Sequence, residues 1–297
     1  MRVLLLGGTG QVGTEIRALA PQKSIEVVAP GRDQVDLRDA KAIETIMAAE
    51  PWRAVINAAA YTEVDRAESD EAAAFGVNAE APGLLAAETG RRRIPLIHIS
   101  TDYVFDGRKG TPYVEQDPVA PLNVYGRSKL AGEQAVQKAG AWHVILRTSW
   151  VYSPFGKNFV RTILRLAAER DRLTIVADQR GCPTAALDIA AACLDIATDC
   201  GTKPQQGRYG IYHFAGAGEA TWFEFAGAIV GMAAKRLGKS PLVVPIRTAD
   251  YPTPAARAAD TRLDSTKAVR AYGVEQRPWR QALEETVDRL LRQKDIP

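Results

Sequence analysis

The sequence has few of the residues that build metal sites and disulfide frameworks. Its 297 residues include three cysteines, Cys182, Cys193 and Cys200, and three histidines. The cysteines form no CxxC pair and their number is odd, so neither a structural zinc site nor a disulfide framework is expected. Free thiols are usual where thiols stay reduced, which makes a cytoplasmic location the default expectation.

Long apolar runs and a strong net charge are also missing. The apolar run after Arg2 is too short for the core of a signal peptide, and no stretch reaches transmembrane length, so no membrane partner is expected. The net charge of +3 argues against a nucleic-acid partner, because such proteins usually show clustered Lys and Arg. Hydrophobic residues make up 46%, which is ordinary for a globular protein of one or two domains.

Strands and helices are expected to alternate through the first half of the chain. Apolar runs predict buried strands at residues 3–6, 25–29, 54–57, 95–100 and 141–146, with helical patterns between them. One of these helical patterns, over residues 72–88, is interrupted by Pro82. This alternation is typical of an α/β protein with a doubly wound parallel sheet. After Trp150 the pattern weakens, and shorter helices and strands are mixed. We therefore expect a dinucleotide-binding domain over residues 1–150. Residues 151–297 would form mostly a smaller α/β substrate-binding lobe, partly interleaved with the first domain.

Glycines follow the first predicted strand at regular spacing. Gly7, Gly10 and Gly13 form a G-x-x-G-x-x-G motif between that strand and a helical stretch, residues 15–20. Glycine permits a tight turn there and lets backbone N–H groups approach a pyrophosphate at the helix N-terminus. The alternative is a plain strand-to-helix turn. Arg32, after the second strand, favours NADPH over NADH, because arginine suits a 2′-phosphate; the alternative is an exposed loop arginine.

Other residues near the predicted strand ends also suit a dinucleotide. Asp36 and Leu37, at the start of the next expected helix, can flank an adenine ring. Small residues follow the third strand directly, and they let a ligand pass close to the backbone at the edge where open α/β sheets bind ligands. These residues are Ala58, Ala59, Ala60 and Thr62.

Tyr125 and Lys129 lie four residues apart, so on a helix they share one face. A nearby ammonium favours the phenolate and lowers the pKa of a tyrosine. A phenol tuned in this way can give a proton to a carbonyl oxygen or take one from an alcohol. Thr101 and Asp102 end the fourth predicted strand and place polar groups before this helix.

In this order, the glycine motif, Thr101, Tyr125 and Lys129 resemble the extended short-chain dehydrogenase/reductase superfamily, over essentially the whole chain. That resemblance implies a Rossmann domain with a small C-terminal substrate domain. The finer resemblance is to the dTDP-4-dehydrorhamnose reductase family, and the string Thr-Asp-Tyr-Val-Phe-Asp-Gly at 101–107 is its most specific part. The other matching stretches are residues 7–13, 57–65, 125–129, 147–152, 210–214 and 262–264.

The resemblance implies NAD(P)H-dependent reduction of the C4 keto group of dTDP-4-dehydro-L-rhamnose to dTDP-L-rhamnose, a precursor of cell-surface polysaccharide such as O-antigen. Thr101 would bond the keto oxygen, Tyr125 would deliver the proton, and Lys129 would bind the nicotinamide ribose. The implied cofactor contacts are Gly7, Gly10, Gln11, Val12, Gly13, Arg32, Asp36, Leu37, Ala58, Ala59, Ala60, Thr62, Tyr125 and Lys129. The implied substrate contacts are Thr101, Asp102, Val104, Phe105, Tyr125 and Trp150.

Some assignments stay open. Asp102 would tune the pKa of its neighbours or cap the next turn, and Trp150 would contact the substrate or belong to the core. The diphosphate needs cations or N–H donors, and the sequence does not choose among Arg257, Arg262 and Lys267. Two other functions also remain, a nucleotide-sugar epimerase or dehydratase and a non-catalytic NADP-binding regulatory subunit. The resemblance leaves a homodimer open as well.

Some members of this family hold Mg²⁺ at a dimer interface with acidic side chains. Glu15 is present, but the stretch at 183–188 offers only Asp188. We therefore expect no metal ligands in this chain, and the sequence gives Mg²⁺ little support.

Overall fold

The computed structural model describes residues 1–140 and 142–292. A central sheet of six parallel strands has the order β10-β5-β4-β3-β1-β2. The expected doubly wound α/β class is confirmed. The strands are β1 (Arg2–Leu6), β2 (Glu26–Val28), β3 (Ala54–Asn57), β4 (Leu96–Thr101), β5 (His143–Thr148) and β10 (Gly210–His213).

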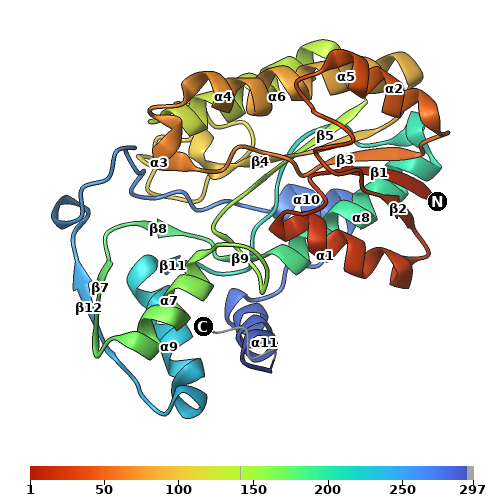
Figure 1. Cartoon of the computed structure of the whole chain (residues 1–297). Helices are drawn as coiled ribbons and strands as arrows, with labels where there is room; N and C mark the ends of the chain where they lie inside the picture. The colour runs from red at the N-terminus through yellow and green to blue at the C-terminus, as the bar shows by residue number, and fades with distance from the viewer. Residues whose placement is uncertain (141, 293–297) are drawn as a thin grey trace.

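Helices cover both faces of this sheet (Figure 1). One face carries α2 (Ala40–Ala49), α4 (Glu71–Phe75), α5 (Ala81–Arg92) and α6 (Val124–Ala139). The other carries α1 (Gln11–Leu19), α8 (Ala186–Thr202) and α10 (Thr266–Tyr272). A strand covered on both faces is mainly apolar, which is why residues 3–6 of β1 and 54–56 of β3 form continuous apolar runs and are buried.

A smaller body lies below the carboxyl ends of the strands in Figure 1. Its helices are α7 (Phe159–Glu169), α9 (Trp222–Leu237) and α11 (Trp279–Arg292), which share a second apolar core containing Phe225 and Leu283. Three two-stranded ribbons complete it. They are β7 (Arg172–Val176) with β12 (Leu242–Ile246), β8 (Arg180–Gly181) with β11 (Ala220–Thr221), and β6 (Val151–Tyr152) with β9 (Thr184–Ala185).

The second half of the chain also returns to the large sheet. Strand β10 pairs with β5 along its whole length, and α8 packs against α1. The body that holds the large sheet, called the main body below, therefore contains residues from both sides of residue 150. The smaller body, formed by α7, α9, α11 and the three ribbons, is called the lobe. The boundary itself stays a prediction.

The helix expected over residues 72–88 is divided, but not by Pro82. A π-helical segment, Gly76–Glu80, joins α4 to α5, and Pro82 occupies the first turn of α5, where its missing N–H costs no bond. π-Helical turns inside α-helices are frequent at functional sites. This one carries Asn78, whose side chain is fully buried.

Two other element boundaries differ from the sequence prediction. The helix expected to begin at Asp36 begins at Ala40, because Asp39 caps it by accepting a hydrogen bond from the Lys41 N–H. Strand β5 runs on through Arg147 and Thr148, which were expected beyond its end. Residue 141, where this strand was expected to start, lies outside the described residues.

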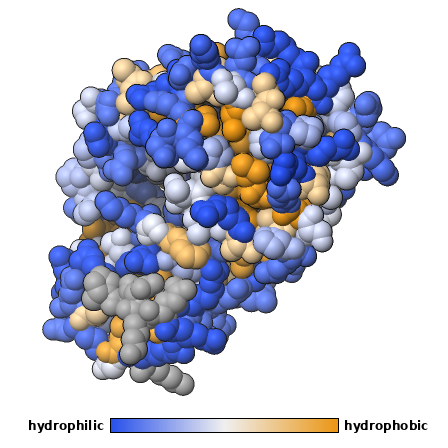
Figure 2. Space-filling model, turned by 45° about the vertical axis from the view of Figure 1, so that its right-hand side comes forward, coloured by the Kyte–Doolittle hydropathy of each residue, from blue (hydrophilic) through white to orange (hydrophobic). Residues whose placement is uncertain are grey.

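The face of the molecule shown in Figure 2 is mainly hydrophilic. Figure 2 shows hydrophobic residues gathered on the main body and few of them elsewhere on that face. Within residues 1–140 and 142–292, no helix combines the length and apolar character needed to cross a membrane.

Candidate active site

The order of the strands reverses at β1, because β2 lies on one side of it and β3 on the other. Connections leaving the carboxyl ends of these strands diverge, and the crevice between them is where doubly wound sheets bind ligands. The glycine motif, the residues after β3 and the polar residues after β4 all lie at this edge of the sheet. The structure thus brings most of the sequence-predicted site residues to one edge.

The glycine turn is packed too closely for any side chain. Gly7 has a φ of 82°, and a Cβ there would lie 2.5 Å from the Ala59 nitrogen. A Cβ on Gly13 would collide with the Gly7 carbonyl oxygen, while the Gly10 N–H donates to that same oxygen. The turn therefore presents bare backbone at the N-terminus of α1, as a bound pyrophosphate requires.

Gln11 and Val12 open helix α1 with different surroundings. The side-chain amide oxygen of Gln11, Oε1, accepts hydrogen bonds from Ser153 Oγ at 3.2 Å and Asn158 Nδ2 at 3.0 Å. Val12 packs into the core beneath the sheet. Gln11 thus ties the glycine turn to the segment that leads into the lobe, and Val12 anchors α1 to the core.

Positive charge gathers after β2. Arg32 is exposed, and its charge helps to lower the pKa of Asp36. The larger cause is Arg38, which donates to Asp36 Oδ1 at 3.1 Å and to Oδ2 at 2.7 Å and holds the pKa of that carboxyl well below its usual range. Sequence reasoning passed over Arg38, although its spacing from Asp36 was visible. Leu37, which lies between Asp36 and Arg38 in the sequence, is half-buried.

The loop after β3 is fixed by two buried asparagines. The Asn57 amide oxygen accepts from the Ala59 N–H at 3.1 Å. Asn78 accepts from the Tyr61 N–H at 2.8 Å and donates to the Tyr61 carbonyl at 3.0 Å and to Ser128 Oγ at 3.0 Å. Ala58 and Ala60 are half-buried, and Thr62 is exposed. The backbone at this edge is therefore held rigid by side chains that face away from the crevice.

Tyr125, Lys129 and Thr101 come together as the sequence predicted. Thr101 is the last residue of β4, and Tyr125 and Lys129 lie one turn apart in α6. Helix α6 begins here because Asn123 accepts from the Gly126 N–H at 2.8 Å. The Thr101 hydroxyl is close enough to Tyr125 to lower its pKa by hydrogen bonding.

The prediction that Lys129 lowers the pKa of Tyr125 is wrong. Burial raises the pKa of Tyr125 above its ordinary value, and the Thr101 hydrogen bond offsets only part of that rise. The Lys129 ammonium instead donates to the Ile99 carbonyl at 2.7 Å. Burial lowers the pKa of Lys129 to about 8, so this side chain is mostly charged at neutral pH.

Asp102 has a buried carboxyl group, and one of its two oxygens accepts no hydrogen bond from the described residues. Burial raises its pKa to about 6, against hydrogen bonds from Thr261 and Thr101 that favour the charged form. Thr101 Oγ1 donates to Asp102 Oδ1 at 3.1 Å, while Oδ2 has no hydrogen-bond partner among the described residues. The turn after β4 is capped by Thr101, which accepts from the Tyr103 N–H. Both roles considered for Asp102, tuning the pKa of its neighbours and capping the turn, therefore stay predictions.

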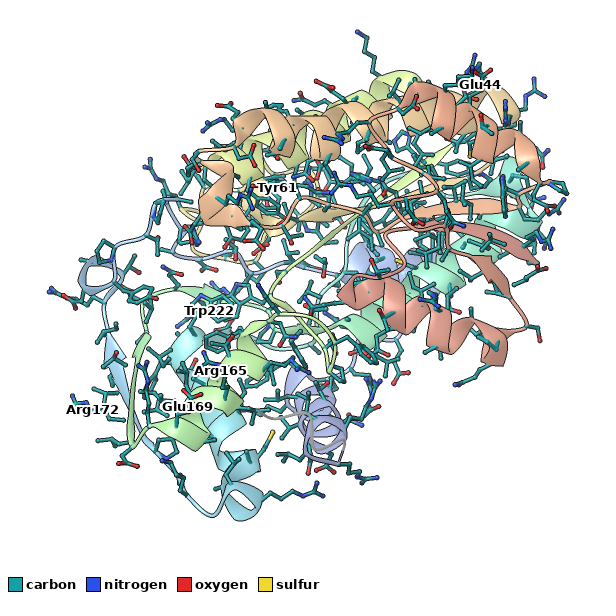
Figure 3. All side chains as sticks on the ribbon, viewed as in Figure 1. Glu44, Tyr61, Arg165, Glu169, Arg172 and Trp222 are labelled. Carbon is teal, nitrogen blue, oxygen red and sulfur yellow. The ribbon has the colours of Figure 1, made fainter. Side chains whose placement is uncertain are left out.

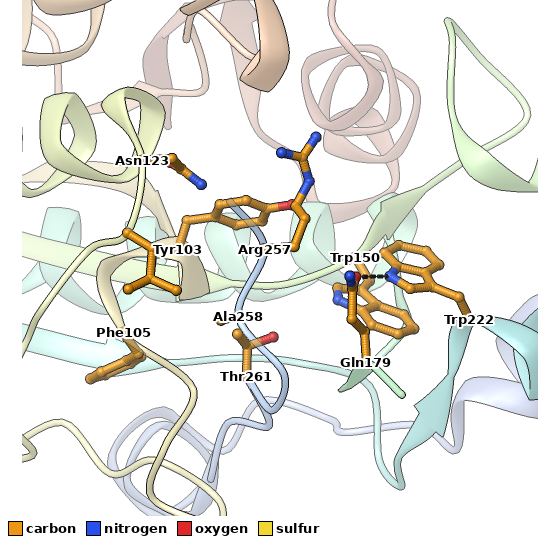
Figure 4. A pocket seen from close by; sticks show the side chains of 10 residues that line it. Tyr103, Phe105, Asn123, Trp150, Gln179, Trp222, Arg257, Ala258 and Thr261 are labelled. Carbon is orange, nitrogen blue, oxygen red and sulfur yellow. Dashed lines mark hydrogen bonds between the residues drawn. The ribbon is translucent and has the colours of Figure 1, made fainter. Parts of the chain in front are cut away.

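A pocket opens beside these residues, between the main body and the lobe. Its lining includes Tyr103, Phe105, Asn123 and Thr261 from one side and Trp150, Gln179 and Trp222 from the other (Figure 4). Phe105 lines this pocket and stacks on Tyr113 with ring centroids 4.1 Å apart. Val104, also expected at the substrate, is fully buried in the core. In Figure 3, Tyr61 lies on the main body and Trp222 on the lobe.

Trp150 is held in an unusual position. Its φ of 45° is in the left-handed region, which bulky residues seldom adopt. Its indole stacks on that of Trp222 with centroids 3.5 Å apart and planes within 5°. A Cβ on Gly181 would lie 2.5 Å from the Trp150 ring, so only glycine fits behind it. The strained backbone and the close packing together aim this indole at the pocket.

The lobe side of the pocket was largely missed from sequence. Trp222 Nε1 donates to the Gln179 oxygen at 3.2 Å, and the Gln179 amide donates to Thr248 Oγ1 at 3.0 Å. Thr261 reaches Asp102. These residues come from segments far apart in the chain, and no local motif joins them.

The acidic residues considered for Mg²⁺ are paired with arginines. Glu15 accepts from Arg289 at 3.0 Å, and Asp188 accepts from Arg277 Nε at 2.8 Å. Glu285 also accepts from Arg277 at 2.8 Å. In the part of the chain that the structure describes, no cluster of three or more His, Cys, Asp or Glu side chains has an arrangement suited to a metal ion. The residues present do not fit a metal, since guanidinium groups already neutralise the carboxylates.

Comparison with known proteins identifies the family. Residues 1–292 match the family described as RmlD substrate binding domain. A dTDP-4-dehydrorhamnose reductase from Burkholderia thailandensis is 44% identical, with 99% of this chain and all of that protein covered. The chain belongs to the dTDP-4-dehydrorhamnose reductase family. The string Thr-Asp-Tyr-Val-Phe-Asp-Gly, on which the sequence resemblance mainly rested, lies at the end of β4 beside the pocket.

Solved structures of the reductase family have the same fold. The crystal structure of a dTDP-4-dehydrorhamnose reductase from Clostridium acetobutylicum is 33% identical, with a TM-score of 0.90 over 98% of this chain and 99% of that one. A dTDP-4-dehydrorhamnose reductase from Bacillus anthracis, solved in complex with NADP, is 31% identical, with a TM-score of 0.88 over 97% and 99%. The reductase family therefore shares both the sheet and the lobe.

Proposed function

We propose that this protein uses NADPH to reduce the C4 keto group of dTDP-4-dehydro-L-rhamnose, giving dTDP-L-rhamnose. The observation that carries the proposal is that Thr101 and Asp102, at the end of β4, lie beside Tyr125 of α6, whose ring packs against Tyr103 of the pocket lining. A proton donor for an alcohol and a cradle for a dinucleotide are the two parts that a ketone reductase needs. Family membership supplies the substrate class.

The proposed cofactor fits the residues at the strand ends. The backbone of Gly7, Gly10 and Gly13 would hold its pyrophosphate, because a Cβ on Gly7 or Gly13 would fill that space. Arg32 and Arg38 would attract the 2′-phosphate that distinguishes NADPH from NADH. When bound, NADPH supplies the hydride for the sugar carbon. The chain's own residues then supply orientation and the proton.

Proton transfer would proceed through the two hydroxyl groups. Thr101 and Tyr125 would both bond the keto oxygen, and Tyr125 would release its proton as negative charge develops there. A buried phenol keeps its proton until that moment, which suits a general acid at neutral pH. The Lys129 ammonium, one turn away on the same face, would bond the nicotinamide ribose and so help to orient the cofactor. Asp102, with its pKa of about 6, would adjust the proton affinity of Thr101.

Spectrophotometry at 340 nm tests the proposal directly. Purified protein should oxidise NADPH in the presence of dTDP-4-keto-L-rhamnose made in situ from dTDP-glucose by the upstream dehydratase and epimerase. NADH should be used less efficiently, because it lacks the phosphate that Arg32 and Arg38 would bind. Cofactor binding with no oxidation of either nucleotide would overturn the proposal in favour of an epimerase or a regulatory subunit.

Removal of metal ions should leave the enzyme unchanged. Arginines already neutralise Glu15 and Asp188, so neither activity nor folding needs a divalent cation. We expect kcat and the melting temperature to be the same with and without excess EDTA. A loss of activity that Mg²⁺ restores would contradict this expectation.

The cellular setting forms part of the same proposal. All three cysteines are buried free thiols, which supports a reducing compartment such as the cytoplasm. The homodimer expected from the family resemblance stays a prediction, which sedimentation of the purified protein would check.

A further inference from the structure

The pocket contains one positive charge. Of the residues that line it, Arg257 alone is charged within the part of the chain described, and its guanidinium side chain is 18% exposed. The rest of the lining is aromatic, amide, hydroxyl or aliphatic. A ligand with an anionic group would therefore be oriented in this pocket by Arg257.

Hydrogen bonds to Asp65, to Asn123 and within its own loop hold Arg257 and its backbone in place. Asp65, in α3 (Val64–Ala67), accepts from the Ala255 N–H at 3.2 Å and from Arg257 Nη2 at 2.9 Å. The Asn123 amide donates to the Ala256 carbonyl at 2.9 Å, and Arg257 Nη1 donates to the Ala255 carbonyl at 2.8 Å. These bonds join the C-terminal half of the chain to two elements of the main body. The guanidinium is therefore held in place before any ligand arrives.

The other two cations considered from sequence are engaged elsewhere. Arg262 donates to both oxygens of Asp260, to Glu219 at 2.5 Å and to the Gly110 carbonyl. Lys267 donates to the Ile211 carbonyl at 2.6 Å and lies over the Tyr212 ring. Neither residue lines the pocket. Of the three cations that the sequence left open for the diphosphate, Arg257 is therefore the one that lines the pocket.

Arg257 is also placed correctly relative to the reacting end. It lies beside Tyr103 in Figure 4, where burial raises the pKa of that phenol and the charge of Arg257 offsets part of the rise. The Tyr103 ring packs edge-on against the Tyr125 ring, with centroids 5.3 Å apart. One aromatic side chain therefore separates the guanidinium from the proposed proton donor, which suits a substrate whose anionic group is joined directly to the reacting sugar.

We propose that Arg257, positioned by Asp65, is the subsite for the diphosphate of the nucleotide-sugar; this rests on the proposed function. A guanidinium has five N–H donors in a planar fork, so it can keep its bond to Asp65 on one edge and bind phosphate oxygens on another. Asp65 is 44% exposed, and water screens its charge. The diphosphate would sit at Arg257 with the sugar directed past Tyr103 toward Tyr125.

Calorimetric titration with dTDP and with thymidine tests this subsite without relying on catalysis. The protein is saturated with NADP⁺, and wild type is compared with Arg257→Gln and Arg257→Lys. We expect Arg257→Gln to weaken dTDP binding roughly 10- to 100-fold, the size of charge-assisted hydrogen bonds, and to leave thymidine and NADP⁺ binding unchanged. Arg257→Lys should fall between, because it keeps the charge and loses the fork.

Arg247→Gln is the matched control, since it removes the same charge from an exposed lobe residue paired with Asp250. It should bind dTDP as wild type does. Wild-type dTDP affinity in Arg257→Gln, or an equal loss for dTDP and thymidine, would overturn the subsite. If Arg257→Gln does not fold, the same comparison is decided by Arg257→Lys. A wild type that binds dTDP through Arg257 but oxidises no NADPH would disprove the proposed reaction and leave the subsite standing.

Discussion

Replacing Tyr125 by phenylalanine should lower kcat by roughly 100-fold or more, the usual size of a lost general acid. The ring stays in place, because its edge-on contact with Tyr103 and its burial need no hydroxyl. NADPH affinity and the melting temperature should therefore stay close to wild type. The measurement is steady-state NADPH oxidation with the dTDP-4-keto sugar, with cofactor titration beside it.

Tyr209→Phe provides the control for Tyr125→Phe. Tyr209 is also partly buried, and its hydroxyl donates to the Pro204 carbonyl at 2.7 Å, outside the pocket. It should keep normal turnover. Near-normal turnover in Tyr125→Phe would refute the assignment of Tyr125 as the proton donor, and an equal loss in both variants would point to a structural cause.

The largest effect on stability should come from Glu133. Its carboxylate is fully buried and accepts from Arg147 Nε at 2.9 Å and Nη2 at 2.7 Å, and from Ser100 Oγ at 2.5 Å. Glu133→Leu would leave the Arg147 guanidinium buried without a counter-charge, and the free energy of unfolding should fall by about 3–5 kcal/mol. Denaturant unfolding followed by circular dichroism measures this change. The lost charge would also lower the pKa of Lys129 further, because Glu133 raises it.

Two controls separate the buried pair from ordinary ion pairs. Glu169→Leu removes a partner of Arg165 on the exposed surface of α7, and such pairs contribute less than about 1 kcal/mol. The double variant Glu133→Leu with Arg147→Met removes both buried charges and should recover much of the lost stability. If Glu133→Leu and Glu169→Leu cost the same, the buried network does not stabilise this fold.

The sequence predicted the parts of the site that depend on short-range patterns. The glycine motif comes directly after the strand at residues 3–6, and Tyr125 and Lys129 are one helical turn apart. The motif and the pair could therefore be placed from spacing alone. The pKa of Tyr125 could not, because it depends on burial by segments distant in the chain. Trp222, Gln179 and Thr261 were missed for the same reason, since they reach the pocket only through the packing of the lobe.

The errors in the predicted helix and strand boundaries also have identifiable structural causes. Pro82 suggested a break in a helix, yet the break is the π-helical segment before it, which turns Asn78 toward Tyr61. Strand β5 continues through Thr148, beyond its predicted end at residue 146, and Arg147 in it is buried. Only the bidentate bond to Glu133, on a different element, makes its burial possible. Charged residues that are buried with a distant partner are invisible to a hydrophobicity pattern.

The return of β10 to the large sheet limits how this protein can be divided. A fragment ending near residue 150 would lack β10, and the backbone N–H and C=O groups of β5 along that side would become a bare edge. Exposed edges of apolar strands recruit other chains, so such a fragment should aggregate rather than survive as a cofactor-binding minidomain. Loss of α8 would also uncover the apolar side of α1. Nascent chains leaving the ribosome face the same hazard until the strand at Gly210–His213 has been made.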